Sequence, residues 1–221
     1  NGVYGFSSIA ECSGDAAETV LKAATENAGF MDRHVGRGKE PLPVIPCSQI
    51  SRGRDILDTD QKRYVEFASQ LDAYITEKYP GLSSRSVIVS EDSMEKIICT
   101  SDGCSGHICA PRSYIYVFLN SETTSGTPIE LFKPLGGAGN FSDNFTDPAL
   151  LYPQIDALYE QLMQKREGVY AEAGYKTVVL SGFMSGMLAH EAVGHTVEAD
   201  LVLGGSVAGP SLNKCVASEL V

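Results

Sequence analysis

The apolar positions of the chain first recur with the period of a helix. They do so from Gly14 to Ala28 and again after Asp58, where apolar residues stand every three or four positions. The second helix has the clearer apolar stripe, which predicts its buried face: Tyr64, Phe67, Ala68, Leu71 and Ile75. Asp58 and Gln61 form a capping pair that predicts its start. Pro80 and Gly81 predict its end.

Two further segments near the N-terminus are predicted to be extended. Val3 to Ile9 is typical of a short strand that precedes the first helix. Arg37 to Pro46 carries several prolines, which forbid a helix, so this segment is predicted to connect the two helices.

From Ser84 onward the apolar period falls to two, which is the period of a strand. An Asp-Gly turn at Asp102 and Gly103, together with the short spacing of the apolar runs, predicts an antiparallel meander. Its predicted strands are Val87–Val89, Lys96–Cys99, Gly106–Cys109 and Tyr114–Leu119, with Pro128–Phe132 as a candidate fifth. The run from Gly136 to Gly139 lacks the Gly-Lys-Ser/Thr signature of a phosphate-binding loop and is predicted to be a flexible loop.

The helical period returns towards the C-terminus. Asp147 and Pro148 predict the start of a helix whose apolar stripe contains Ile155, Leu158, Tyr159, Leu162 and Met163. A buried strand is predicted from Tyr175 to Ser181, and a further helix from Gly182 to Glu198. This order of elements predicts an α+β fold, with helices around a mostly antiparallel sheet. We expect two parts, an α+β region at residues 1–181 and a region at residues 182–221 that begins with the last helix.

The densest chemistry of the chain lies in that last helix. The stretch from Leu188 to His195 reads Leu-Ala-His-Glu-Ala-Val-Gly-His and supplies two imidazoles and a carboxylate, His190, His195 and Glu191. Neutral imidazole suits zinc, and a carboxylate next to a ligand can take a proton from the attacking water, as in the H-E-x-x-H helix of metallopeptidases. The spacing alone is equally compatible with a buried helix whose histidines form local hydrogen bonds.

The two histidines are five residues apart, one more than in the H-E-x-x-H motif. On an α-helix a step of five turns through about 140°, which would separate the two imidazoles. A π-helical turn brings such positions back onto one side. Gly194 makes this distortion cheaper. We therefore predict that the helix widens its hydrogen bonding near Gly194.

At these residues the chain resembles the TldD/PmbA family of zinc metallopeptidases, and specifically its catalytic members. The resemblance rests on His-Glu-Ala-Val-Gly-His at residues 190–195, on Glu198 and Asp200, and on Gly204, Gly205 and Ser206. It implies that His190 and His195 bind zinc and that Glu191 is the general base. It also implies a third zinc ligand, a cysteine far downstream, which this chain does not contain. Cys215 comes too early in the sequence to match it.

The resemblance further implies an activity and partners. The substrates of this chain would be unfolded or small peptides, because it resembles that family. Members of the family work as homo- or hetero-dimers with a related subunit. Because family members are much longer, we expect this chain to be a fragment that is inactive alone. The alternative is a metal-free fragment or a non-catalytic assembly module of such a complex. Glu198 or Asp200 is a candidate for orienting a histidine N–H.

Charge and composition limit the classes of partner that the chain is expected to bind. The net charge of −11 argues against nucleic acid, because phosphate binding requires an excess of Lys and Arg. No apolar run is long enough for a membrane span and no leader pattern is visible, so we expect a cytoplasmic protein without a membrane partner.

The six cysteines offer a rival metal or redox constellation. Cys99, Cys104 and Cys109, with His107 between them, are spaced by five, which does not match the short knuckles of structural zinc sites. Free cysteines are often buried, so we predict that they fill the core and that His107 has no special role.

Overall fold

A computed structural model describes residues 3–34, 50–57, 60–101, 103–211 and 213–216. The chain forms two compact units, residues 1–168 and residues 169–221, and each is described by itself. The fold is α+β, as the order of elements predicted. The predicted boundary after residue 181 stays a prediction. No helix among these residues combines the length and the apolar character needed to cross a membrane.

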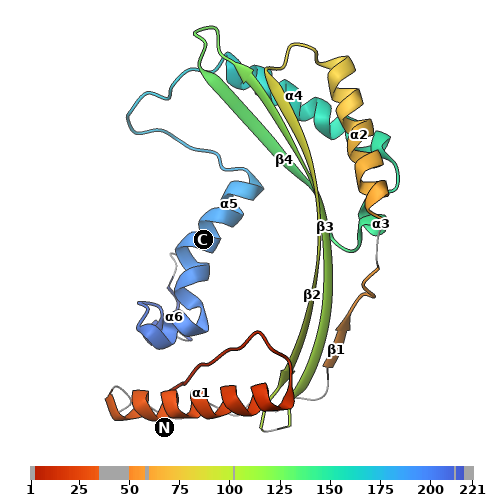
Figure 1. The fold of residues 1–221 in the computed structure, drawn as a ribbon. Helices are drawn as coiled ribbons and strands as arrows, with labels where there is room; N and C mark the ends of the chain where they lie inside the picture. The colour runs from red at the N-terminus through yellow and green to blue at the C-terminus, as the bar shows by residue number, and fades with distance from the viewer. Residues whose placement is uncertain (1–2, 35–49, 58–59, 102, 212, 217–221) are drawn as a thin grey trace. The chain divides into compact units, whose positions relative to one another are not determined.

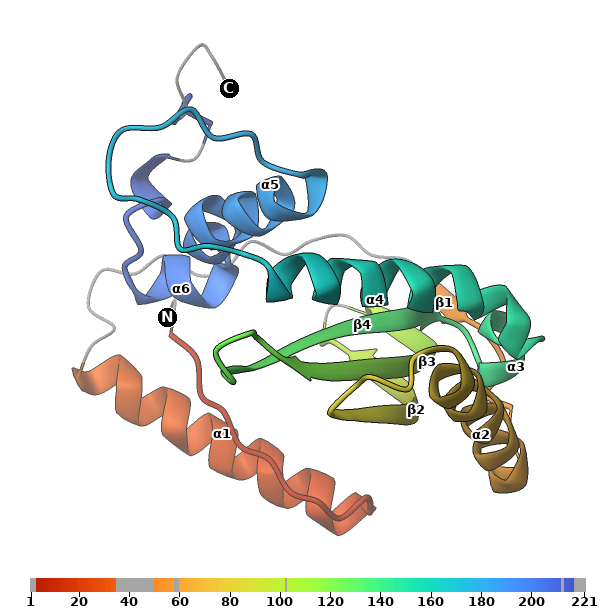
Figure 2. The same ribbon diagram turned by 90° about the horizontal axis from the view of Figure 1, so that it is seen from above.

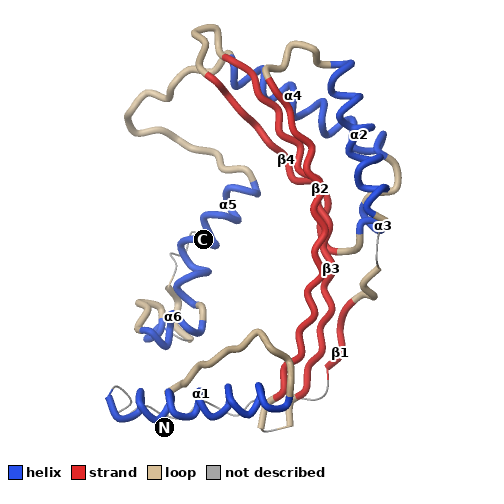
Figure 3. The backbone as a smooth tube through the Cα atoms, viewed as in Figure 1, coloured by secondary structure: helices blue, strands red, loops and turns tan. Residues whose placement is uncertain are grey.

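The first unit is built on a four-stranded sheet with β3 at its centre. Strand β2 (Ser84–Cys99) pairs antiparallel with β3 (Ser105–Glu122) over nearly its whole length. Two strands share the other edge of β3: β1 (Ile50–Gly53) runs parallel to its first part, and β4 (Pro128–Ala138) runs antiparallel to the rest. The predicted meander is confirmed as β2-β3-β4, and the parallel β1 was not foreseen. Figure 3 shows β2 and β3 as continuous long strands.

The predicted breaks inside these strands are wrong. Separate strands were predicted on either side of residues 90–95 and of residues 110–113. Both gaps lie within one continuous ladder, in which Ser93 pairs with Pro111. The carbonyl of Pro111 accepts a hydrogen bond from Gly139 N at 2.8 Å, so the nitrogen of Pro111 faces the same edge of β3. On that edge the pairing with β1 ends at Cys109 and the pairing with β4 begins at Arg112. Pro111 is tolerated because its missing N–H falls in this gap between the two partner strands.

The predicted flexible loop at Gly136 to Gly139 is also wrong, because Gly136, Gly137 and Ala138 continue β4. Gly136 has a φ of +110°, and a Cβ there would collide with the backbone of Ser113 and the ring of Phe145. The glycine therefore serves close packing of β4 against its neighbours.

Helices α2 (Gln61–Lys78) and α4 (Tyr152–Arg166) cover one face of this sheet (Figures 1 and 2). The short α3 (Phe141–Asn144) and the 3₁₀ turn Pro148–Leu151 close the core beside them. The core confirms the predicted stripes of both helices. It contains Phe67, Leu71, Ile75, Ile115, Val117, Leu119, Leu135, Phe141, Phe145, Leu151, Ile155, Leu158 and Leu162.

The helix starts follow capping chemistry, with one shift. Asp147 accepts from Ala149 N at 2.9 Å, as its place before Pro148 predicted. The cap of α2 is Asp60, whose carboxylate accepts from Lys62 N at 3.0 Å. The predicted cap at Asp58 lies outside the described residues.

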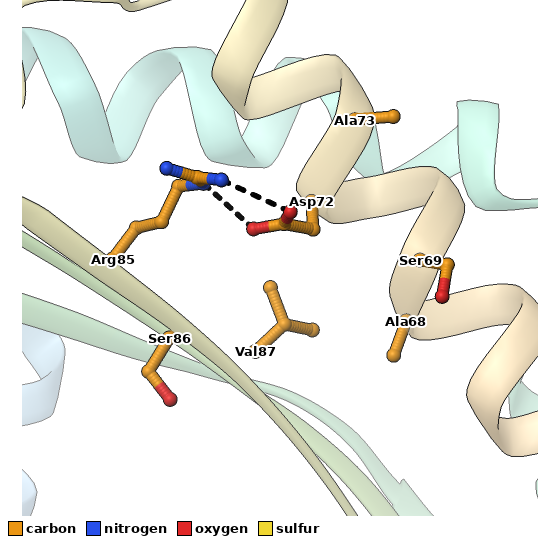
Figure 4. Close-up of a pocket in the computed structure, with 7 residues that line it drawn as sticks. All are labelled: Ala68, Ser69, Asp72, Ala73, Arg85, Ser86 and Val87. Atoms are coloured by element: carbon orange, nitrogen blue, oxygen red, sulfur yellow. Dashed lines mark hydrogen bonds and ion pairs between the residues drawn. The ribbon is translucent and has the colours of Figure 1, made fainter.

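A forked ion pair ties α2 to the sheet. Arg85 donates from Nε to Asp72 Oδ1 at 2.6 Å and from Nη2 to Asp72 Oδ2 at 3.0 Å, above a shallow hollow between α2 and β2 (Figure 4). The pair raises the pKa of Arg85, chiefly through these hydrogen bonds. This bidentate geometry fixes the helix against the strand at a point beside the core.

The N-terminal helix α1 (Gly14–His34) is longer than predicted and starts at the predicted cap, where Ser13 Oγ accepts from Ala16 N at 3.2 Å. The segment before it is not a strand. Gly5 lies so close to the backbone of α1 that a Cβ would not fit, and Asn27 Nδ2 donates to Phe6 O at 2.9 Å. The segment therefore packs along α1 instead of joining a sheet. The predicted connector, Arg37 to Pro46, lies outside the described residues.

The second unit is a chain of short helical turns. Its elements are α5 (Gly182–Ala189), a π-helical turn (His190–Gly194), a 3₁₀ turn (His195–Val197), α6 (Ala199–Gly204) and a 3₁₀ turn (Gly209–Ser211). The strand predicted from Tyr175 to Ser181 is wrong. That segment is neither helix nor strand, and Val178 and Val179 are 70% and 92% exposed, because no strand within the described part of the chain pairs with it.

Candidate metal centre

The motif helix begins where the sequence predicted. Ser181 caps α5, since its Oγ accepts from Met184 N at 3.3 Å and its carbonyl accepts from Ser185 N at 2.9 Å. The first two turns are regular α-helix and bring His190 to the end of α5.

The predicted widening of the helix is confirmed. Residues His190–Gly194 form a π-helical turn, in which the N–H of His195 donates to the carbonyl of His190. The i to i+5 bond closes one turn between the two histidines, which places their ring centroids 4.4 Å apart with the planes at 70°. The extra residue of the motif is thus absorbed in the backbone, and both imidazoles stand on one side.

Glu191 joins the two histidines in one group. One ligand atom from each of His190, Glu191 and His195 lies within 4.8 Å of the others. Glu191 Oε2 is 3.7 Å from His195 Nε2. The three residues that the sequence singled out are therefore brought together, and their roles stay a prediction.

Glu198 orients one of the imidazoles. Its Oε1 lies 2.7 Å from His195 Nδ1, a separation at which an ionised carboxylate accepts the ring N–H. In the neutral imidazole this contact assigns the N–H to Nδ1 and leaves the lone pair of Nε2 on the side of Glu191, as a metal ligand requires. Of the two acids considered from the sequence, Glu198 makes this contact. Asp200 instead accepts from Leu201 N at 2.9 Å, at the start of α6.

The donor set fits zinc. Two imidazoles and a carboxylate are ligand types that zinc accepts, and the His195 ring is held by a carboxylate in the manner of metal-bound histidines. The side chains of His195 and Glu191 are 46% and 64% exposed within the described residues, so the group is open to an ion. Cys215 is exposed and does not belong to it.

The remaining cysteines depart from the prediction that they fill the core. Cys12 and Cys99 are exposed, Cys109 is half-buried, and Cys104 is disulfide-bonded. For Cys109 the prediction failed because the fully buried positions of β3 begin only at Pro111. His107 lies close to Glu95 and Cys109, and the three side chains form a second group of ligand types that was not predicted.

Comparison with known proteins points in the same direction as this geometry. No family model matches the chain. A protein named "Metalloprotease" from Methanothermobacter thermautotrophicus is 26% identical to it over 227 residues, which cover 99% of the chain and 47% of that protein. The chain thus spans about half the length of the curated relative it matches. The similarity supports a metallopeptidase in general terms and does not single out the TldD/PmbA family.

Proposed function

We propose that this chain carries the zinc ligands and the general base of a metallopeptidase of the TldD/PmbA type. The observation that supports this most directly is the π-helical turn, which gathers His190, Glu191 and His195 into one group. A regular helix would turn the two histidines about 140° apart, so the distortion is explained if both imidazoles bind one ion.

Each residue has a role in the proposal. His190 and His195 hold the zinc, His195 through Nε2 because its Nδ1 faces Glu198. A bound zinc ion supplies a Lewis acid, which makes water more acidic and polarises a carbonyl. Glu191 takes the proton from the attacking water and delivers it to the leaving amine. Glu198 positions the His195 ring.

The proposed ligand set is incomplete within the chain. Tetrahedral catalytic zinc sites take three protein ligands and keep one position open. We propose that a cysteine after Val221 in a longer protein supplies the third, which agrees with the span of the archaeal relative. On this proposal the 221-residue chain binds zinc weakly and cleaves peptides poorly alone.

The substrate and partners follow from the same proposal. The substrate is an unfolded or small peptide, and the protein works in the cytoplasm as a homo- or hetero-dimer with a related subunit. Sedimentation equilibrium of the purified chain, alone and with such a subunit, tests the pairing. A chain that stays monomeric in both mixtures contradicts it.

The metal and the base are tested separately. We expect zinc, measured by elemental analysis after equilibrium dialysis, to bind the parent chain, and His190→Ala to lose the share of zinc that the motif group holds. We expect Glu191→Gln to keep the metal, because it removes only the group that moves the proton. In a longer form that includes the downstream cysteine, Glu191→Gln should lower the hydrolysis of a fluorogenic peptide by at least about 100-fold.

Two results would contradict this function. If neither the chain nor the longer form binds zinc in a His190-dependent way, the group is structural and the chain is an assembly module. If the longer form binds zinc but Glu191→Gln cleaves peptides as fast as the parent, the site is a metal site without the proposed base.

A further inference from the structure

A second group of metal-ligand side chains lies on the sheet of the first unit. Glu95 comes from β2, and His107 and Cys109 come from β3. Glu95 pairs directly with Cys109 across the two strands, and His107 stands two residues before Cys109. Because side chains alternate along a strand, all three project from the same face of the sheet.

Further along β3 the same face of the sheet is covered by the core. Glu95, His107 and Cys109 lie on the part of the face that the core does not cover. Ile115 and Val117 follow Cys109 at even steps on the same face and are fully buried. His107 and Cys109 are only half-buried, and the side chain of Glu95 is 58% exposed. An ion from solvent can therefore reach all three side chains.

The three donor atoms lie within 4.8 Å of one another. His107 Nε2 is 2.8 Å from Glu95 Oε1 and 3.4 Å from Cys109 Sγ. In a Cys-His-acid relay the thiol faces one ring nitrogen and the acid holds the other. Here the thiol and the carboxylate share the same nitrogen, so the arrangement is not a relay. Three ligand atoms this close to one another can instead share one ion.

The backbone of Cys109 is held from both edges. On one side it pairs with Glu95, and on the other with Gly53. A Cβ atom added at Gly53 would collide with Cys109, so the two strands are in close contact there. Arg54 N also donates to Cys109 O at 3.3 Å. Because the strand is fixed, an ion would have to order only side chains, which lowers the cost of binding.

We propose that Glu95, His107 and Cys109 form a second cation site, for a borderline-soft divalent ion of the zinc class. A carboxylate, an imidazole and a thiolate are together a donor set that such ions accept. Neighbouring ligands around tetrahedral zinc stand roughly 3.3–3.6 Å apart, as its bond lengths require. The distance from Cys109 Sγ to His107 Nε2 already matches, and the exposed Glu95 has to withdraw by only about half an ångström. The fourth position stays open.

Cobalt(II) tests this site, because it occupies zinc sites and a thiolate ligand gives it a charge-transfer band in the near ultraviolet. The 221-residue protein is titrated with Co²⁺ alone in oxygen-free buffer. We expect the band to appear, to saturate at one equivalent in His190→Ala, where the motif site is removed, and to be lost in Cys109→Ser and in His107→Ala. Circular dichroism of each variant checks that the sheet is intact.

Two control variants separate this site from other ligands. Cys99→Ser should keep the band, since this exposed free thiol lies on the same face but pairs with Ser105. His190→Ala should also keep it, because the motif group contains no thiol. A parent protein without the band, or a band that survives Cys109→Ser, would overturn the proposal whatever happens at the motif helix.

Discussion

At the scale of single residues, the contact between Glu198 and His195 matters most for the metal centre. Glu198 Oε1 lies 2.7 Å from His195 Nδ1, which leaves Nε2 as the nitrogen that we propose to bind zinc. We predict that Glu198→Ala weakens zinc binding by about 10- to 100-fold without abolishing it, the usual cost of losing such a contact. Competition with a chromophoric chelator measures this.

The matched control for that change is Asp200→Ala, because Asp200 contacts only backbone nearby. It should leave zinc affinity within about twofold of the parent, with Glu198→Gln between the two variants. Equal zinc affinity in Glu198→Ala and in the parent would show that the ring is positioned by other means.

A second residue-scale prediction concerns Asp156, which joins α4 to α2. Its carboxylate accepts from Tyr74 Oη at 2.6 Å, from Tyr79 Oη at 2.5 Å and from Lys78 Nζ at 2.8 Å. Burial opposes the ionisation of Asp156, but these hydrogen bonds outweigh it and lower its pKa. A lowered folded-state pKa adds stability that is full above the unfolded value and is lost as pH falls through the folded value.

We therefore predict that Asp156→Asn is less stable than the parent at pH 7 and that the difference shrinks in acid, below the ordinary pKa of 3.8. Urea unfolding of both proteins across this range measures it. Asp147→Asn, at an exposed helix cap, serves as the control carboxylate. A difference that grows as the pH falls would contradict the assigned cause.

Residues close in sequence could be predicted, and residues joined by strand register could not. His190, Glu191 and Glu198 lie within about two turns of one helix, so their spacing alone suggested a shared site. The contact of Glu95 with His107 depends on the register of β2 against β3. The predicted meander did not fix that register, and Glu95 lay outside the predicted strand Lys96–Cys99.

At the scale of elements, the π-helical turn is the feature that makes the centre. Gly194 was expected to ease the distortion. It has αR dihedrals, however, and a Cβ there would meet His190 Nδ1 at an ordinary 3.6 Å. We predict that Gly194→Ala keeps the turn and binds zinc within about threefold of the parent, since alanine favours helix and finds room.

The same titration with a chelator tests Gly194→Ala. Gly194→Pro is the contrasting variant, because proline in a helix interior removes a backbone donor and clashes with the preceding turn. It should lose the metal. If Gly194→Ala also loses it, the turn depends on glycine for a reason other than space or dihedral angles.

Elements with a local cause were predicted better than those with a tertiary one. The apolar stripes of α2 and α4 and the cap at Asp147 came directly from periodicity and capping residues. The strand expected from Tyr175 to Ser181 failed because an apolar run becomes a strand only when another strand pairs with it. The opposite error was made at Gly136, where close packing, not flexibility, requires the glycine.

At the scale of the whole molecule, the apolar core belongs to the first unit. The buried apolar side chains that form it lie between Phe67 and Leu162, whereas α5 of the second unit buries none among the described residues. The cooperative unfolding transition of the chain should therefore report on the first unit. It should not report on the motif helix, whose state is measured by metal binding.

Leu71 tests this division, because it is fully buried at the centre of α2. We predict that Leu71→Ala lowers the free energy of unfolding by about 2–5 kcal/mol, through lost apolar contact and the cavity left behind. Val65→Ala, on the same helix but 64% exposed, should change it by less than about 0.5 kcal/mol. Urea unfolding followed by far-ultraviolet circular dichroism measures both variants. A small change in the free energy of unfolding for Leu71→Ala would mean that α2 does not pack on the sheet as described. Relaxation of a well-packed core around the cavity does not restore the contacts that this side chain makes.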